Sequence, residues 1–586
     1  MSQELIPRNL PDYRDVLAEG RAIADSIEMG ESKFKKEHGM NVTRWRNEKA
    51  KTGEIVFLPQ LGVSTLEQQE RAQKEVYERC KRNGVELGVN LITSNWINGV
   101  PTELRDKIPK STSFVMNGAE DFKRLADASP MQPIFADYTC MCPNSVSNVV
   151  NAIRAGCAGV GTFSQIAWKY PYCDDDVAQV VAAVTALGIL SGKVRESEEV
   201  QIQGYQGDGI ASAFVDRASE LGFTLFEQYI AEQLCGVPYK EGLGGTMSNI
   251  PDKLAMWLAT YEGLKENARF PNRTIINFYQ GNTLEPGNEP MANYGLILAD
   301  FIPFALLERK LKTGSLYMPV PVMESIRVPT LDEAADATLA CAAALQRLPE
   351  LEESNFFNEQ EIYKRRDRIL EGGKKFYQNM LTELPKLGVD IKNPIHCLLA
   401  IKRLQGAKLE ELCHPAKRDP GRYRGIAPYL ITDLMRKALD RAQAAVEDLR
   451  SKHDVNELKG KKIIVCSGDT HEYGLMLVNY VFCAFGAECF NLGVDTDPEE
   501  ALDAAAEKGT PYIAVSIHNG QSLAWAERAV NEMQKRNQEV RLFMGGRLNT
   551  VKDGLTEPVD VSEEIASLGV HVSNDLDIML KELSRT

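Results

Sequence analysis

The sequence lacks the features that nucleic-acid-binding, secreted and membrane proteins need. Its 67 lysines and arginines are outnumbered by 82 acidic residues, which gives a net charge of -15 at pH 7. Because an acidic surface repels phosphates, we expect no nucleic acid as partner. Residues 1–5 show no charged segment before an apolar one, and no apolar run approaches the about 20 residues of a membrane span. The sequence therefore predicts a cytoplasmic protein without membrane contact.

Cysteine pairs with the spacing of a disulfide framework are also missing. The 12 cysteines are scattered over the chain, and we interpret them as reduced thiols. Cys140 and Cys142 are separated by one residue, which is too tight for the usual structural zinc site, and no second pair has matching spacing. We expect both to be small core or loop residues.

What the sequence does have is a regular alternation of apolar segments and helical patterns from about residue 54 onward. This alternation indicates parallel βαβ units, and about eight of them over roughly 300 residues favour a closed (β/α)8 barrel. An open sheet would satisfy the same periodicity. The expected strands lie at residues 55–58, 85–91, 112–116, 133–136, 159–162, 200–204, 224–226, 274–278 and 316–320, and the expected helices at 65–83, 144–155, 174–191, 210–221, 250–267 and 331–345.

The chain is long enough for two or three domains, and we predict four segments. Residues 1–45 form an N-terminal helical arm, and residues 46–350 form the TIM-barrel substrate domain. Residues 351–459 are a charged helical extension and linker; the basic loop within it predicts either contact with an anionic group or a solvated linker. Residues 460–586 form a second α/β domain, doubly wound and flavodoxin- or Rossmann-like.

The clearest chemical signal follows a buried strand predicted at residues 462–467. Asp469, His471 and Gly474 come directly after it, at the edge where open parallel sheets hold ligands. Asp469 is spaced to accept a hydrogen bond from one imidazole nitrogen of His471, which leaves the other nitrogen for a metal. Gly474 allows bulky planar material to approach the backbone.

These residues resemble the D-x-H-x-x-G motif of cobalamin-binding domains, in which the histidine replaces the cofactor's own base beneath cobalt. In that family a serine and a Gly-Gly pair, each after a further strand, hold the nucleotide tail. One departure is His518, because the family usually has an apolar residue two positions after the serine. The resemblance makes His471 the cobalt ligand and implies that the cofactor is bound by Asp469, Thr470, His471, Gly474, Ser516, Gly545 and Gly546.

Residues 50–345 resemble the large subunit of glutamate mutase, an adenosylcobalamin-dependent radical enzyme. The resemblance rests on residues 59–63, on Asn117, on residues 167–172 and on residues 323–330. It implies that the adenosyl side of the cofactor is lined by Gly62, Asn117, Pro171 and Glu324, with Glu324 hydrogen-bonding the ribose. The placement of both domains on one chain resembles 2-methyleneglutarate mutase, whose substrate is a dicarboxylate.

The three arginines that clamp the substrate carboxylates in this family have no counterparts here. Gln60, residues 137–139 and residues 95–98 take their places, and the amine-binding glutamate falls at Thr162. We therefore expect a pocket for a less anionic molecule than glutamate. The expected substrate-binding residues are Gln60, Thr162 and Tyr138, and the expected catalytic residues, which orient the substrate, are Tyr172, Trp168 and Asp137. A new carboxylate anchor from Lys169, Arg273 or Arg327 is the alternative.

The resemblance implies an isomerase, namely a carbon-skeleton mutase that uses adenosylcobalamin and its cobalt for radical chemistry. The alternatives are a corrinoid-dependent methyltransferase and a cobalamin-binding sensor; a coenzyme A-dependent mutase and a pyridoxal-phosphate-dependent aminomutase fit less well. By analogy with the family we expect a small-molecule substrate and a homo-oligomer, either a dimer or a tetramer. The need for a reactivating chaperone stays open.

Overall fold

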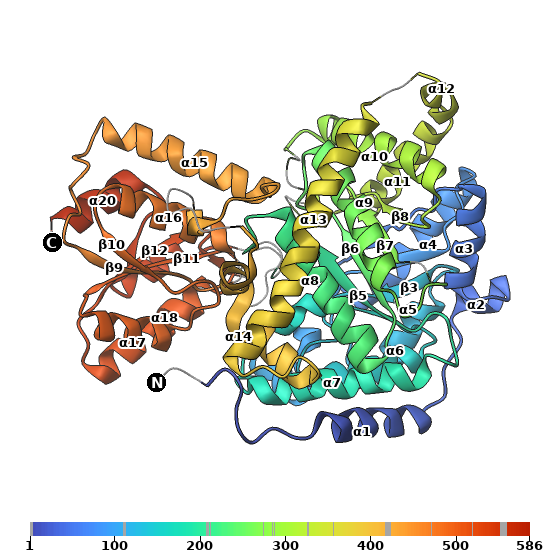
Figure 1. Cartoon of the computed structure of the whole chain (residues 1–586), viewed down its shortest axis with the longest axis horizontal. Helices are drawn as coiled ribbons and strands as arrows, with labels where there is room; N and C mark the ends of the chain where they lie inside the picture. The colour runs from blue at the N-terminus through green and yellow to red at the C-terminus, as the bar shows by residue number, and fades with distance from the viewer. Residues whose placement is uncertain are drawn as a thin grey trace. The chain divides into compact units, whose positions relative to one another are not determined.

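The structure is a computed structural model, and the chain divides between Asp433 and Leu434 into two compact units (Figure 1). It describes residues 4–108, 113–206, 210, 213–273, 275–283, 285, 287–324, 327, 329–354, 357–416, 423–469, 471–518, 520–550 and 559–585.

The first unit is built around eight parallel strands that pair in sequence order. A parallel bridge between Phe57 and Tyr317 joins the two ends of the series, so the predicted barrel is confirmed. The strands are β1 (Gln60–Leu61), β2 (Val89–Ile92), β3 (Gln132–Phe135), β4 (Gly159–Gly161), β5 (Gln201–Gln206), β6 (Tyr239–Leu243), β7 (Ile276–Gln280) and β8 (Leu316–Met318). The surrounding helices are α4 (Leu66–Arg82), α5 (Ala119–Asp127), α6 (Ser145–Arg154), α7 (Asp176–Lys193), α8 (Arg217–Gln228), α9 (Ile250–Asn267), α10 (Pro290–Leu311) and α11 (Leu331–Leu345).

Two of the predicted strands are wrong, and one strand was missed. Residues 224–226 lie inside α8, because a short apolar run fits a buried helix as well as a strand. Residues 113–116 are irregular. The missing strand is β6. It contains the charged residues Lys240 and Glu241, so it has no apolar run, although both residues are buried.

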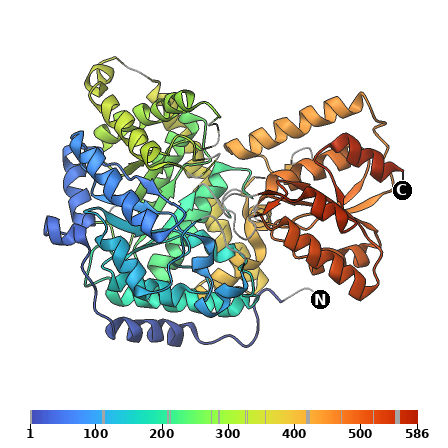
Figure 2. The same ribbon diagram turned by 180° about the vertical axis from the view of Figure 1, so that it is seen from behind.

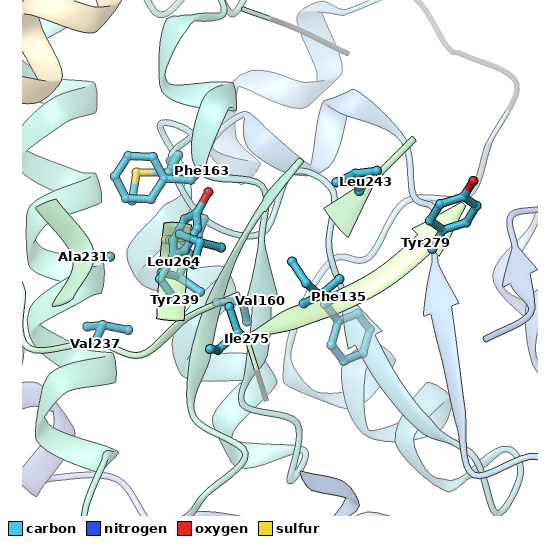
Figure 3. Close-up of a cluster of buried hydrophobic side chains, with 14 of the residues drawn as sticks. Phe135, Val160, Phe163, Ala231, Val237, Tyr239, Leu243, Leu264, Ile275 and Tyr279 are labelled. Carbon is cyan, nitrogen blue, oxygen red and sulfur yellow. The ribbon is translucent and has the colours of Figure 1, made fainter. Parts of the chain in front are cut away.

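Strand side chains alternate between two apolar layers. Val89, Leu91 and Phe278 belong to a cluster inside the barrel. The other face of the strands packs against the helices in a larger cluster, of which Figure 3 shows Phe135 and Val160 among others. The barrel thus has a filled interior, and its substrate site is expected at the carboxyl ends of the strands.

Helices outside the barrel sequence still pack onto this unit. In Figures 1 and 2, α1 (Tyr13–Asp25) runs beside α7. The two helices approach closely at Gly20, where a Cβ atom would lie 2.2 Å from the carbonyl oxygen of Thr185. Helix α13 (Glu359–Glu383) packs on α8 and α9, and α14 (Pro394–Cys413) packs on α7. The arm and the helical extension are therefore continuous with the barrel core.

Helices α7 and α10 are long and apolar enough to span a membrane by length and composition alone. Both contribute buried side chains to the barrel core, which accounts for their apolar residues. Core helices commonly pass the same test, so neither helix is evidence for a membrane.

The second unit contains a five-stranded parallel sheet in the order β10-β9-β11-β12-β15. Helices cover both faces, and each face has its own apolar cluster, so the predicted doubly wound fold is confirmed. The strands are β9 (Lys462–Ser467), β10 (Glu488–Asn491), β11 (Tyr512–Ile517), β12 (Arg541–Gly546) and β15 (His571–Val572). The helices are α16 (Glu472–Ala484), α17 (Pro498–Lys508), α18 (Ser522–Arg536), α19 (Ser562–Ser567) and α20 (Leu576–Ser584).

A buried histidine fastens the last helix of this unit. His453 contacts Glu457 through Nδ1 and Asp577 through Nε2, both at 2.6 Å.

We expect His453→Gln to lower the free energy of unfolding by about 1–2 kcal/mol. One neutral amide cannot replace two charge-assisted contacts, and the loss stays modest because the carboxylates are partly solvated. Urea unfolding of the full chain measures the change. His571→Gln is the control for the charged contacts, because His571, which also stacks on Phe543, contacts a single exposed carboxylate at 3.3 Å. Equal losses in both variants would contradict the assignment.

Candidate cobalamin site and barrel mouth

The carboxyl edge of the second sheet brings the motif residues together. Ser516 on β11 stands in register with Ser467 on β9 and with Gly545 on β12. Asp469 and His471 follow β9 directly, so the three segments predicted to bind the cofactor lie at one edge. Thr470 lies outside the described residues.

Asp469 orients the imidazole of His471. Its carboxylate is buried and lies 3.1 Å from Nδ1, and it also accepts the backbone N–H of His471 at 2.9 Å and that of His518. Burial alone would raise the pKa of this carboxyl, but the hydrogen bonds and the charge of His471 keep it below its usual value. An ionised Asp469 therefore holds the imidazole proton on Nδ1. This leaves a lone pair on Nε2, and the His471 side chain is 43% exposed.

Glycines permit close packing behind this edge. A Cβ atom at Gly474 would lie 2.0 Å from the hydroxyl oxygen of Ser516, and one at Gly545 would lie 2.8 Å from the carbonyl oxygen of Ser573. Gly546 has φ of +111°, a conformation that side chains disfavour.

Asn574 holds the Gly-Gly turn and was missed by the sequence analysis. Its Oδ1 accepts the N–H of Gly546 at 2.7 Å, and its Nδ2 donates to the carbonyl of Gly546 at 3.0 Å. No motif marks this asparagine, because its partner lies on another strand.

A family model described as the B12 binding domain matches residues 462–562. The second unit contains a B12-binding domain. No curated protein matches the chain. A solved structure described as a novel cobalamin-binding protein from Desulfitobacterium hafniense DCB-2 is 21% identical, with a TM-score of 0.18; the match covers 25% of this chain and 66% of that one. That likeness is too low to bear on function. Cobalamin binding is thus supported by the family match.

The carboxyl edge of the second sheet offers one nitrogen donor that a cobalt ion held in a corrin ring could accept. The oriented Nε2 of His471 would supply that lone pair. Within the described parts of the chain, no group of three or more His, Cys, Asp or Glu side chains could hold a metal ion without such a ring. The residues present therefore fit the cofactor.

At the barrel mouth, one glutamine joins residues predicted separately. Gln165 accepts the backbone N–H of Tyr138 at 2.8 Å and donates to the Asp137 carboxylate at 3.3 Å. It also closes a capping box with Thr162, and the Tyr138 ring lies 5.5 Å from that of Trp168. The loops after β3 and β4 thus bring together four predicted site residues, and the sequence analysis missed Gln165 that links them.

The other predicted mouth residues are more dispersed. Gln60 donates to Thr93 at 3.3 Å, and its Oε1 is buried without a hydrogen-bond partner. Tyr172 is 56% exposed with φ of 62°, next to Pro171. Asn117 accepts a hydrogen bond from Arg105 at 3.5 Å and is exposed.

Gly62 and Glu324 follow the first and the last strand of the barrel. A Cβ atom at Gly62 would lie 2.8 Å from the carbonyl oxygen of Thr93, so a larger residue would displace the loop after β2. Burial raises the pKa of the Glu324 carboxyl. Three neighbours of Glu324, residues 325, 326 and 328, lie outside the described residues.

Two of the three alternative carboxylate anchors are engaged elsewhere. Arg273 donates to backbone carbonyls of residues 194–200, just before β5 and thus at the opposite end of the barrel. Arg327 pairs with both carboxylate oxygens of Glu333 in α11. Residues 417–422 of the basic loop lie outside the described residues, whereas His414 contacts Asp216 at 3.0 Å.

Proposed function

We propose that the chain is an adenosylcobalamin-dependent carbon-skeleton mutase, an isomerase whose substrate is a small molecule other than glutamate. The observation that carries the proposal is the presence, on one chain, of a B12-binding domain and a closed (β/α)8 barrel. The barrel residues Gly62, Asn117, Pro171 and Glu324 match the adenosyl side of the glutamate mutase family, and all four follow strands at the end where barrels bind substrates.

The mouth supports a substrate with fewer carboxylates than glutamate. Gln60 and Thr162 are neutral where the family has charged residues, and Arg327 is neutralised by Glu333. Arg105, in the loop after β2, donates to the backbone carbonyls of Asn98, Val100 and Met116. Planar guanidinium groups that are already bonded in this way have few donors left for a substrate carboxylate.

In this mechanism the residues of the chain bind the cofactor and orient the substrate. His471 would hold cobalt through Nε2 while Asp469 keeps the proton on Nδ1. Adenosylcobalamin supplies radical chemistry when bound, so no strong general base is required of the protein. Asp137 would bind a hydroxyl or amine of the substrate, and Gln165 fixes its direction. Trp168 and Tyr172 would contact the substrate from the loop after β4, and the barrel wall excludes water.

Electron paramagnetic resonance tests the proposal. Protein loaded with adenosylcobalamin is frozen after mixing with hydroxy acids, amino acids, dicarboxylic acids or acyl-coenzyme A esters. We expect a cobalt(II) signal coupled to an organic radical with one class of substrate and none with glutamate. The Asp137→Asn variant should lose the signal for that substrate while retaining the cofactor. Methyl transfer from methylcobalamin to an acceptor, with silence across the panel, would overturn the proposal in favour of a methyltransferase.

A further inference from the structure

Helix α14, in the segment that follows the barrel, is kinked at one residue. Gln405 lies inside the helix but has φ of 59° and ψ of 170°, far from helical values. Residues other than glycine rarely adopt this conformation, and it persists only where the surrounding contacts compensate for its cost. The contacts of Gln405 therefore indicate what the kink is for.

These contacts are made with the loop after β4. Nε2 of Gln405 donates to the carbonyl of Ala167 at 2.9 Å and to that of Lys402 at 2.8 Å. The ammonium group of Lys402 donates to the carbonyl of Trp168 at 2.9 Å and to that of Ile166 at 3.4 Å. Two side chains of one helix thus hold three consecutive carbonyl groups of this loop.

Lys402 is a costly residue at this place. Its side chain is only 5% exposed, and burying an ammonium group is unfavourable unless acceptors surround it. The acceptors include Oε1 of Gln179 at 2.9 Å, and a carboxylate oxygen of Asp176 lies 3.7 Å away; both residues belong to α7. An apolar residue would fill the same space without this cost. The role of Lys402 therefore lies in its hydrogen bonds, two of which go to the loop.

A glycine brings the same part of α14 against a second loop of the barrel. A Cβ atom at Gly406 would lie 2.5 Å from the carbonyl oxygen of Ile210 and 2.9 Å from the Cβ atom of Ala213, in the segment after β5. The loops after β4 and β5 both lie at the carboxyl end of the barrel, where the substrate is expected. Residues 402–406 therefore contact the mouth of the barrel.

We propose that Lys402 and Gln405 are positioning residues, which hold the loop after β4 so that the indole of Trp168 stays in place for the substrate. The helical segment after the barrel thereby belongs to the substrate site, and it acts through the loop rather than by contact. The role of Trp168 toward the substrate rests on the proposed mutase, whereas the hold on the loop rests on the hydrogen bonds alone.

Fluorescence of Trp168 tests the hold in the full chain without added corrinoid. The signal of this residue is the difference between a chain with Trp168 and the same chain with Trp168→Phe. We expect Lys402→Met to raise the acrylamide quenching constant of Trp168 at least about twofold, since a loop that loses hydrogen bonds opens more often. Gln405→Gly should raise it too without lowering the Tm, because glycine adopts a positive φ without strain.

Lys408→Met is the matched control, because Lys408 is exposed on the same helix, and it should leave the quenching constant unchanged. In the resonance experiment, Lys402→Met and Gln405→Gly should need about tenfold more of the compound that gives the radical signal to reach half of that signal, since small displacements of an orienting group are costly. The dissociation constant of adenosylcobalamin should stay unchanged in both.

Wild-type quenching of Trp168 in both variants would overturn the proposal, as would the same rise in Lys408→Met. Silence of the wild-type protein in the resonance experiment would refute the mutase. The quenching constants would still decide whether α14 holds the loop, so the two failures are distinguishable.

Discussion

Replacing His471 with alanine is expected to weaken adenosylcobalamin binding more than about 100-fold, since loss of groups that merely support a metal ligand already costs 10–100-fold. The same variant should abolish the radical signal expected of the proposed mutase. Equilibrium dialysis measures the affinity, and the absorption spectrum of the bound corrinoid reports whether nitrogen or water lies below cobalt. The reason is that Nε2 of His471 is the nitrogen expected to bind cobalt. The side chain is partly exposed, and its Nδ1 is held by the buried carboxylate of Asp469.

Asp469→Asn is the companion variant. It keeps the imidazole but removes the carboxylate that fixes the Nδ1 proton, so an intermediate loss of about tenfold is expected. A wild-type spectrum and affinity in His471→Ala would refute the ligand assignment, whatever the behaviour of the aspartate variant. Loss of affinity in both variants, with the spectrum of a water ligand in His471→Ala, would support it.

The second large effect is expected on the pH dependence of stability, because two buried carboxyl groups of the barrel share a tyrosine hydroxyl. The hydroxyl of Tyr239 lies 2.7 Å from a Glu227 oxygen and 2.5 Å from a Glu241 oxygen. A phenol has a single proton, so it cannot donate to both carboxylates, and one contact needs a protonated carboxyl as donor. Burial raises the pKa of Glu227 to about 8 and that of Glu241 well above its usual value.

Glu227→Gln is therefore expected to make the protein more stable than wild type at alkaline pH. The folded-state pKa of Glu227 is about 8 against an ordinary 4.5, so the wild-type contribution is fully present below pH 4.5 and is lost as the pH rises through 8. The amide cannot ionise, and its oxygen still accepts from Tyr239. We expect the variant's Tm to exceed the wild-type Tm by several degrees at pH 9, since a few kcal/mol are involved.

Thermal unfolding between pH 5 and pH 9 measures this difference. Glu78→Gln, on the exposed face of α4, serves as control and should follow the wild-type curve. Parallel curves for wild type and Glu227→Gln would mean that the Glu227 carboxyl is ionised throughout.

The same buried charges explain why β6 escaped prediction from the sequence. Strands β9 and β11 contain continuous apolar runs, at residues 463–466 and 512–515, which is typical of parallel strands buried on both faces. Strand β6 instead alternates Tyr239 and Glu241, which share a buried polar cluster, with Lys240. Burial of these polar residues depends on the barrel wall around them and on Glu227 in the preceding helix, so the strand's own sequence could not reveal it.

For the site, predictability depended on whether the partners are close in sequence. Asp469 and His471 are two residues apart, and their hydrogen bond could be anticipated from spacing. Asn574 acts on Gly546 from 28 residues away, and Gln165 acts on Asp137 from the loop after the next strand. Asparagine and glutamine are ordinary loop residues, and only the register of the parallel strands gives them these roles.

The reciprocal bonds between Asn574 and Gly546 also connect the cofactor edge to the end of the chain. Asn574 lies two residues before α20, whose Asp577 is held by His453. A ligand that immobilises the Gly545–Gly546 turn therefore also opposes local opening of the last helix. Slower amide hydrogen exchange in α20 would then report that the cofactor is bound.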